Sequence, residues 1–296
     1  VHAALASQWT SLHRYPDPSG KALKSAIAAT HGIDAAEIAL GNGSHELLMQ
    51  LAQVFAGPED EVLVSRYCFA VYPIAATAVG ARLVLAEALP ADADMPLGHD
   101  LAAMAAGIGA RTKLVFFANP NNPTGTWFSS AALEAFMANV PPHVLVVADE
   151  AYIEYVTDTG LASALALRNR YPNLIVSRTF FFFYGLAGLR AGYLVADPAI
   201  VRLIEPIRAS FNLNAMALVA AEAALSDPVH LDLVRERNAS EREWLATGLA
   251  GLGLQALPSQ TNFLLVHFGT RAAAVERALF DRGVILRPMG GYGLGE

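Results

Sequence analysis

The sequence predicts an α/β fold in which helices cover both faces of a mainly parallel central sheet, beside a smaller α+β domain. Two observations carry this prediction. Short apolar runs alternate with helix-length stretches, and this alternation gives way to long helices at about residue 198. A chain of 296 residues, 54% of them hydrophobic, can also bury a large core. Ligands of such sheets bind at the carboxyl ends of the strands, so chemistry is expected there.

Six short runs rich in Val, Leu, Ile and Phe have the composition of strands that are buried on both faces. These runs are residues 61–65, 82–87, 113–118, 143–148, 174–179 and 191–196. Helices are expected between them. Residues 44–56 have apolar side chains at helical spacing with Ser44 as a cap, and Ser129 or Ser130 caps the next helix.

The chain after residue 198 is expected to form long helices rich in Ala and Leu, then a strand at 262–268 and a helix at 271–282. We expect residues 36–235 to form the large domain, and residues 1–35 together with 236–296 to form the small one. The chain closes on GGYGLGE, a glycine-rich turn with no element after it, so a truncated C-terminus is expected.

Composition excludes several classes of function. The net charge is −7 and no basic block is present, so the long-range field repels nucleic acid. No apolar run reaches the roughly 18 residues of a membrane span, and no secretory signal opens the chain, so we expect a cytoplasmic protein. Cys68 is the only cysteine, which excludes an internal disulfide and a cysteine-based metal cluster. The expected partners are small molecules or a second copy of the chain.

Two polar segments directly follow predicted strands. Residues 119–125, NPNNPTG, come after LVFFA, although turn formers of this kind also end many strands without a function. Residues 148–152, ADEAY, come after HVLVV and place Asp149 at the carboxyl end of a strand, with Tyr152 three residues later. A single acidic residue there also serves as a helix cap in many proteins. Neither segment is specific alone.

A third segment, residues 184–193 with the sequence YGLAGLRAGY, follows the strand LIVSRTF. Its glycines permit a tight turn, and Arg190 can reach back toward the strand ends. A glycine-rich turn is weak evidence by itself. Three such segments in order, each at the end of a buried strand, indicate one shared ligand site.

These segments resemble the fold-type-I pyridoxal-phosphate aminotransferases, most closely the histidinol-phosphate aminotransferase group, over nearly the whole chain. The resemblance implies a three-layer fold, pyridoxal 5′-phosphate as cofactor, and a homodimer. It also implies transamination of a small amino-acid substrate in histidine biosynthesis, with the 2-oxoglutarate/glutamate couple.

The resemblance assigns four residues to the ring of the cofactor. Asn122 and Tyr152 would contact its phenolic oxygen. Asp149 would pair with the pyridinium nitrogen and keep it protonated, so that the ring can absorb electrons during the reaction. Phe69 matches the aromatic residue that stacks on the ring, although core packing explains a lone Phe equally well.

The resemblance also identifies a phosphate end. Residues 41–48, GNGSHELL, are similar to the family's loop before a helix, where N–H groups at Ser44 and His45 would receive the phosphate. Thr179 and Arg190 match further phosphate-binding positions. Many relatives have an acidic residue in place of His45, so its side chain is not assigned a role.

Four more residues are assigned by resemblance alone. Tyr15 matches a tyrosine that reaches the phosphate of the neighbouring subunit in a dimer. Asn212, Asn262 and Arg287 match segments near the substrate, and Arg287 is the best candidate to bind an anionic group. The arginine that grips the substrate α-carboxylate in this family would lie beyond the last residue of the chain.

The family's Schiff-base lysine has no counterpart here. Counting back from Gly188 and from Arg190 places it at position 182, where the chain has Phe182, and Phe181 replaces the preceding serine. The only lysines are Lys21, Lys24 and Lys113. A covalent aldimine is therefore not possible at Phe182, and the resemblance implies an inactive or severely impaired enzyme. On composition alone, the run of four Phe also suits a buried strand.

Three hypotheses stay open at this point. In the first, the chain has the fold and ancestry of a histidinol-phosphate-type aminotransferase, and its residues 181–183 are variant, engineered or mis-assigned, so that activity belongs to the parent enzyme. Alternatively, it is a catalytically silent homologue that binds the cofactor, another ligand or a partner subunit. Finally, it is a related pyridoxal-phosphate enzyme with another substrate, such as an aromatic or other amino-acid aminotransferase or a decarboxylase.

Overall fold

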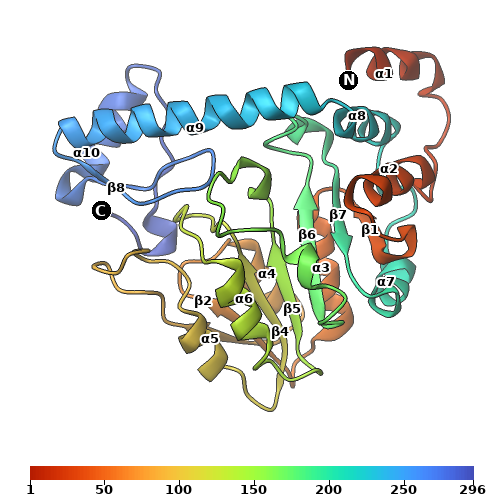
Figure 1. Ribbon diagram of the computed structural model, residues 1–296, viewed down its shortest axis with the longest axis horizontal. Coiled ribbons are helices and arrows are strands. Elements are labelled where there is room, and N and C mark those ends of the chain that lie inside the picture. Colours follow the sequence, from red (N-terminus) through yellow and green to blue (C-terminus); the bar gives the residue numbers. More distant parts are fainter.

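A seven-stranded sheet forms the centre of the molecule in a computed structural model that describes residues 1–296 (Figure 1). The strand order is β1-β7-β6-β5-β4-β2-β3. The strands are β1 (Ile38–Gly41), β2 (Glu61–Ser65), β3 (Arg82–Ala86), β4 (Thr112–Ala118), β5 (Leu145–Asp149), β6 (Leu174–Thr179) and β7 (Gly192–Val195). β3, β2, β4, β5 and β6 are parallel, whereas β7 runs antiparallel to both β6 and β1. The predicted α/β fold with a mainly parallel sheet is confirmed.

Neighbouring residues of each central strand face opposite hydrophobic clusters. In β4, Val115 and Phe117 belong to one cluster, whereas Leu114 and Phe116 belong to the other. Because a strand sends successive side chains to opposite faces, a continuous apolar run is required where both faces are covered. The first cluster lies under α2 (Lys21–His31), α5 (Leu101–Ala106), α6 (Ser130–Met137) and α8 (Ala215–Leu225), and the second under α3 (Ser44–Phe55), α4 (Val71–Ala78) and α7 (Pro198–Ile204).

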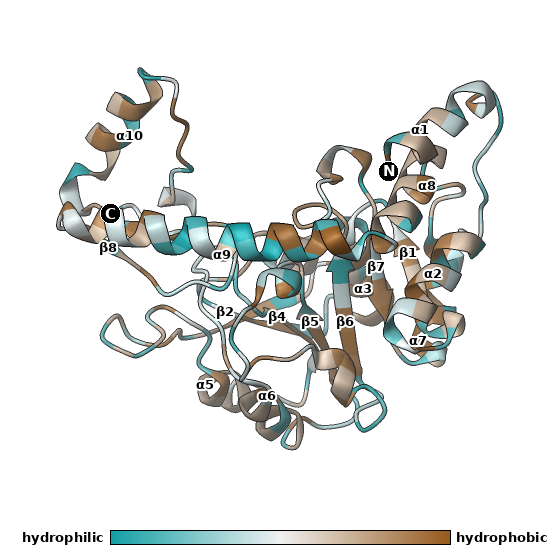
Figure 2. Cartoon of the chain, turned by 45° about the horizontal axis from the view of Figure 1, so that its top comes forward, coloured by the Kyte–Doolittle hydropathy of each residue, from teal (hydrophilic) through white to brown (hydrophobic).

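The longest helix, α9 (Pro228–Gly251), crosses the end of the sheet toward which β6 points (Figure 1). It contacts the short helix η3 (Ile153–Tyr155), which follows β5. Its hydropathy changes along its length, and none of its residues is buried (Figure 2). Beyond it lie β8 (Gln255–Ala256), β9 (Val266–His267) and α10 (Ala272–Phe280). The division into two domains stays a prediction.

The first helix of the chain, α1 (His2–Gln8), packs against α8.

None of the helices combines the length and the apolar character that a membrane span requires.

The structure corrects four details of the sequence-based expectations. Ser44 does not cap α3, because the helix begins at Ser44 and Gly43 occupies the cap position with φ 83°. β1 was not expected, since four residues are too short to show a pattern. Only Val266–His267 of the strand expected at 262–268 pairs with another strand. The four Phe residues do not extend β6, which ends at Thr179. The cap at Ser129 is confirmed, because its Oγ accepts from the Ala132 amide at 3.2 Å.

Candidate cofactor site

The parallel strands bring two polar segments predicted from the sequence to one edge of the sheet. Asp149, the last residue of β5, lies level with Ala118 at the end of β4 and with Ser177 near the end of β6. The NPNNPTG loop leaves β4 at this edge, and the run of Phe residues leaves β6 there. Adjacent parallel strands end together, so residues about 30 positions apart in sequence become neighbours.

Asp149 is buried and only half satisfied. It is 3% exposed, and its Oδ2 accepts a hydrogen bond from the Tyr72 hydroxyl at 3.0 Å. Its Oδ1 is buried without a hydrogen-bond partner. Burial raises the pKa of Asp149 to about 6, because the charged form loses water, and the bond from Tyr72, together with the nearby Ala151 amide and Ser177 hydroxyl, only partly opposes this. An unpaired buried carboxylate oxygen is costly and is a position where a ligand donor fits.

Tyr72 was not identified from the sequence. It is fully buried in α4, and its ring stacks on Phe116 with centroids 5.2 Å apart. Its neighbour Phe69, the predicted stacking residue, meets it edge-on at 5.7 Å. The only available signal was the spacing of two aromatic residues, three apart, in FAVY.

The three asparagines of the NPNNPTG loop have different roles. Asn119 donates to the carbonyl of Phe128 and accepts from its amide, and Asn121 donates to the carbonyl of Tyr67 at 2.7 Å. These two side chains hold the loop. Asn122 instead donates to the Tyr152 hydroxyl at 3.1 Å. The predicted neighbours Asn122 and Tyr152 are therefore brought together.

Phe182 lies directly beside this pair. Its ring is parallel to that of Tyr152, with centroids 4.8 Å apart and planes inclined by 10°, and Phe263 meets Tyr152 edge-on at 5.4 Å. Burial raises the pKa of Tyr152, the hydrogen bond from Asn122 opposes this, and the nearby carboxylate of Asp149 raises it further. Phe263, from the segment before β9, therefore packs beside the predicted pair.

The predicted phosphate-binding residues lie around the start of α3. Ser44 is buried and His45 is exposed. The Thr179 hydroxyl donates to the carbonyl of Ala191 at 3.4 Å. The guanidinium carbon of Arg190 lies 3.9 Å from the centre of the Phe181 ring. The ring of Phe181 therefore packs against Arg190, one of the groups that were expected to bind the phosphate.

The predicted substrate and dimer residues are less closely gathered. Tyr15 is 82% exposed and stacks on Phe211, with centroids 4.6 Å apart. Asn212 donates to the carbonyl of Leu40 and to Glu46, so its amide holds the start of α3 in place.

Asn262 and Arg287 are both exposed. Asn262 lies near the hydroxyl of Tyr155, whose pKa burial raises to about 12 against the opposing effect of Asn262. Arg287 forms no ion pair within the chain, so no charged partner fixes its side chain in the site.

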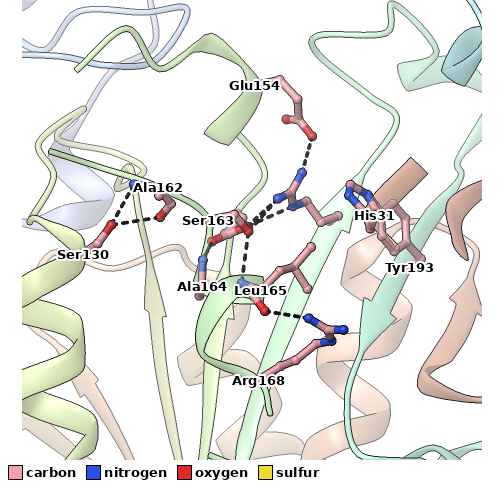
Figure 3. Close-up of polar contacts among 11 residues, drawn as sticks. His31, Ser130, Glu154, Ala162, Ser163, Ala164, Leu165, Arg168 and Tyr193 are labelled. Atoms are coloured by element: carbon pink, nitrogen blue, oxygen red, sulfur yellow. Dashed lines mark hydrogen bonds and ion pairs between the residues drawn. The ribbon is translucent and has the colours of Figure 1, made fainter. Parts of the chain in front are cut away.

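A buried ion network on the other face of β6 holds the segment that follows Asp149. Arg178 donates from Nε to Glu150 at 2.9 Å, from Nη1 to Glu154 at 3.0 Å and from Nη2 to Ser163 at 2.8 Å. Figure 3 labels Glu154 and Ser163, which lie on either side of this network. Arg235 of α9 donates to the carbonyl of Glu154 at 2.9 Å. This network joins α9, the loop after β5 and β6.

Burial and ion pairing shift the pKa values of the charged groups in this network in opposite directions. Burial raises the pKa of Glu154, while Arg178 lowers it. Burial would lower the pKa of Arg178, but Glu150 and Glu154 outweigh it and raise that pKa. The guanidinium therefore stays charged, and removing it would leave buried carboxylates without a counterion.

The two ends of the site fit pyridoxal phosphate unequally. At the ring end, the free Oδ1 of Asp149 matches a protonated ring nitrogen, and the Asn122–Tyr152 pair matches a phenolic oxygen. At the phosphate end, the ring of Phe181 packs on Gly43, where a Cβ would lie 2.5 Å from its Cζ. The ring end fits the cofactor and the phosphate end does not.

Comparisons with known proteins agree on one family. The family model for aminotransferase class I and II matches residues 1–296. A histidinol-phosphate aminotransferase of Nitrosococcus oceani is 48% identical over 281 residues, covering 95% of this chain and 74% of that protein. One from Pseudomonas fluorescens is 46% identical and covers 99% of this chain and 77% of its own. The crystal structure of histidinol-phosphate aminotransferase from Sinorhizobium meliloti, in complex with pyridoxal 5′-phosphate, is 32% identical, with a TM-score of 0.89 over 96% of this chain and 77% of that one.

Proposed function

Since the chain belongs to the aminotransferase class I and II family, we propose that it has the pocket of a histidinol-phosphate aminotransferase but that Phe182 stands where the reactive lysine belongs. The parent reaction would move an amino group between histidinol phosphate and 2-oxoglutarate. The chain as it stands would not carry out that transfer, or would do so very slowly.

One observation carries this proposal. The side chain at position 182 is a phenyl ring that lies flat against Tyr152. Pyridoxal phosphate, when bound, supplies an electron sink that stabilises a carbanion on the substrate. Its use in transamination needs an amine that holds the cofactor and moves a proton, and a phenyl ring has no atom that can do either. Lys21 and Lys24 lie in α2 and Lys113 lies at the start of β4, so none of the three lysines is at the carboxyl end of a strand.

The remaining ring-end residues support retention of a binding role. Asp149 would pair with a ring nitrogen, and Asn122 with Tyr152 would bind a ring hydroxyl. This arrangement favours the second candidate function, a catalytically silent homologue that still binds a ring-shaped ligand. Without such a ligand the buried Oδ1 of Asp149 stays unpaired, which disfavours a purely structural role.

The assignments of Phe69, Thr179, Arg190, Asn212, Asn262 and Arg287 are part of the same proposal and follow from family resemblance. Tyr15 would reach the site of a second copy in a homodimer. Its exposure in the single chain is consistent with that role.

The test combines mass and turnover. The purified chain is incubated with pyridoxal phosphate, reduced with borohydride and digested, and amino transfer from histidinol phosphate to 2-oxoglutarate is measured in parallel. We expect no fixed cofactor at residues 180–184 and no transfer above background. A cofactor fixed at a single lysine, together with turnover, would show that the assignment of position 182 is wrong.

A further inference from the structure

The start of α3 is covered by an aromatic side chain. A Cβ built on Gly43, the residue before the helix, would lie 2.5 Å from Cζ of Phe181 and 3.0 Å from Nη2 of Arg190. Helix N-termini bind anions because their first N–H groups have no partner within the helix. Here a ring and a guanidinium pack directly on the backbone that an anion would approach.

The guanidinium of Arg190 is held over that ring. Its carbon lies 3.9 Å from the ring centre of Phe181, and its Nη1 donates to the carbonyl of Ala187 at 3.2 Å. The face of an aromatic ring attracts a cation, so the ring of Phe181 stabilises the charge of Arg190 when no anion is bound. Phe181 itself is 9% exposed, so little of it is left to solvent.

At the opposite end of the site, a buried polar group still lacks a hydrogen-bond partner. Asp149 is 3% exposed and has one oxygen without a partner, while Tyr72 occupies the other. The Asn122–Tyr152 hydrogen bond lies nearby. A small aromatic ring with a protonated nitrogen would supply the donor that Asp149 lacks.

We propose that this site binds phosphate-free rings of the pyridine type, because the ring of Phe181 covers the anion cradle at the start of α3 and holds Arg190 against its own face. The inference rests on the proposed function, since it takes the Asp149 end as the end that holds the ring. A phosphate forced against Phe181 would lose water and find an apolar surface, whereas a ring without a phosphate would avoid that cost.

The test compares two ligands that differ only in the phosphate. The full-length chain is titrated in a calorimeter with pyridoxine and with pyridoxine 5′-phosphate, neither of which has an aldehyde that could react with surface amines. We expect the two dissociation constants to agree within about threefold, and an excess of inorganic phosphate to change neither. Binding of the phosphate ester about tenfold or more tightly, with competition by inorganic phosphate, would overturn the proposal.

Two variants locate the effect. In Phe181→Ser the cradle is open and a hydroxyl is available, so the phosphate ester should gain about tenfold in affinity while pyridoxine changes little. Phe182→Ser is the matched control, since that ring lies on Tyr152 and not on Gly43, and it should leave the ratio between the two ligands unchanged. An equal gain in both variants, or no gain in Phe181→Ser, contradicts the closure by Phe181.

Absence of binding by both ligands to all three proteins would overturn the proposal as well, because Asp149 would then not recruit a ring. The proposed function is tested by different readouts, namely cofactor fixed to a lysine and turnover of histidinol phosphate. The two failures are therefore distinguishable.

Discussion

The ring of Phe182 lies parallel to that of Tyr152, and the Tyr152 hydroxyl still accepts the hydrogen bond from Asn122. The phenyl side chain is therefore accommodated without breaking the polar pair beside it. No lysine lies beside this pair, and the groups that would orient a ring under the proposed function are in place.

Placing Ser at 181 and Lys at 182, as the proposed assignment expects, should raise the affinity for the cofactor. In the F181S/F182K variant, affinity for pyridoxal phosphate should rise about tenfold or more, because a covalent link and a phosphate donor become available. Absorbance of the bound cofactor and the mass fixed by borohydride at position 182 measure this. Phe280→Lys, which adds a lysine at an exposed position, is the control. If both variants respond alike, the assignment of position 182 fails.

Replacing Asp149 should change the pH dependence of stability. The pKa of Asp149 is about 6 in the folded chain against an ordinary value of 3.8, so its contribution is favourable at low pH and is lost as the pH rises from about 4 to about 6. Asp149→Asn removes this loss and keeps an acceptor for Tyr72. The variant should gain about 2 kcal/mol relative to the unmodified chain between pH 4 and pH 7, at about 1.4 kcal/mol per pKa unit. Urea unfolding at both pH values checks this, and a pH-independent difference contradicts it.

Removing the charge of Arg178 should be strongly destabilising. Its side chain is 7% exposed and is paired with Glu150 and Glu154, so Arg178→Met leaves buried carboxylates unpaired and should cost about 3–5 kcal/mol in the free energy of unfolding. Arg66→Met breaks the exposed pair with Glu87 and should cost much less. Similar losses in the two variants would mean that the network does not act as a buried ion pair.

A methyl group at Gly192 should disturb the junction between β7 and α3. A Cβ there would lie 2.7 Å from the carbonyl carbon of Gly43 and 3.1 Å from the carbonyl oxygen of Arg178, and backbone atoms cannot easily yield. Gly192→Ala should therefore lower stability by about 1–3 kcal/mol. At Gly188 a Cβ meets nothing within 4 Å, so Gly188→Ala should be almost neutral in thermal unfolding. Equal melting temperatures would show that the backbone yields at this junction.

Much of the sheet could be predicted because parallel strands buried on both faces are continuous apolar runs. β6 was placed at its observed bounds, and Asp149 was placed at a strand end for the same reason. β1 has only four residues, IALG, and joins the sheet beside β7 from far along the chain, so local composition contains no signal for it.

The contacts that complete the site could not be read from the sequence, because they join distant residues. Tyr72 and Asp149 are 77 positions apart, and Gly43 and Phe181 meet only after α3 docks against β7. Arg178 belongs to a run of mostly apolar residues, and nothing in that run indicated that two carboxylates from the loop after β5 would surround it.

The packing of Phe181 and Phe183 also has an evolutionary consequence. Phe183 is 2% exposed and packs edge-on against Tyr155. Reactive sites commonly lower the stability of a fold, because charged and strained groups are kept for function. Under the proposed function, the rings of Phe181 and Phe182 fill positions where such groups would stand. Selection for stability alone would therefore not remove these rings, and a lineage that had lost the reaction could retain the whole fold.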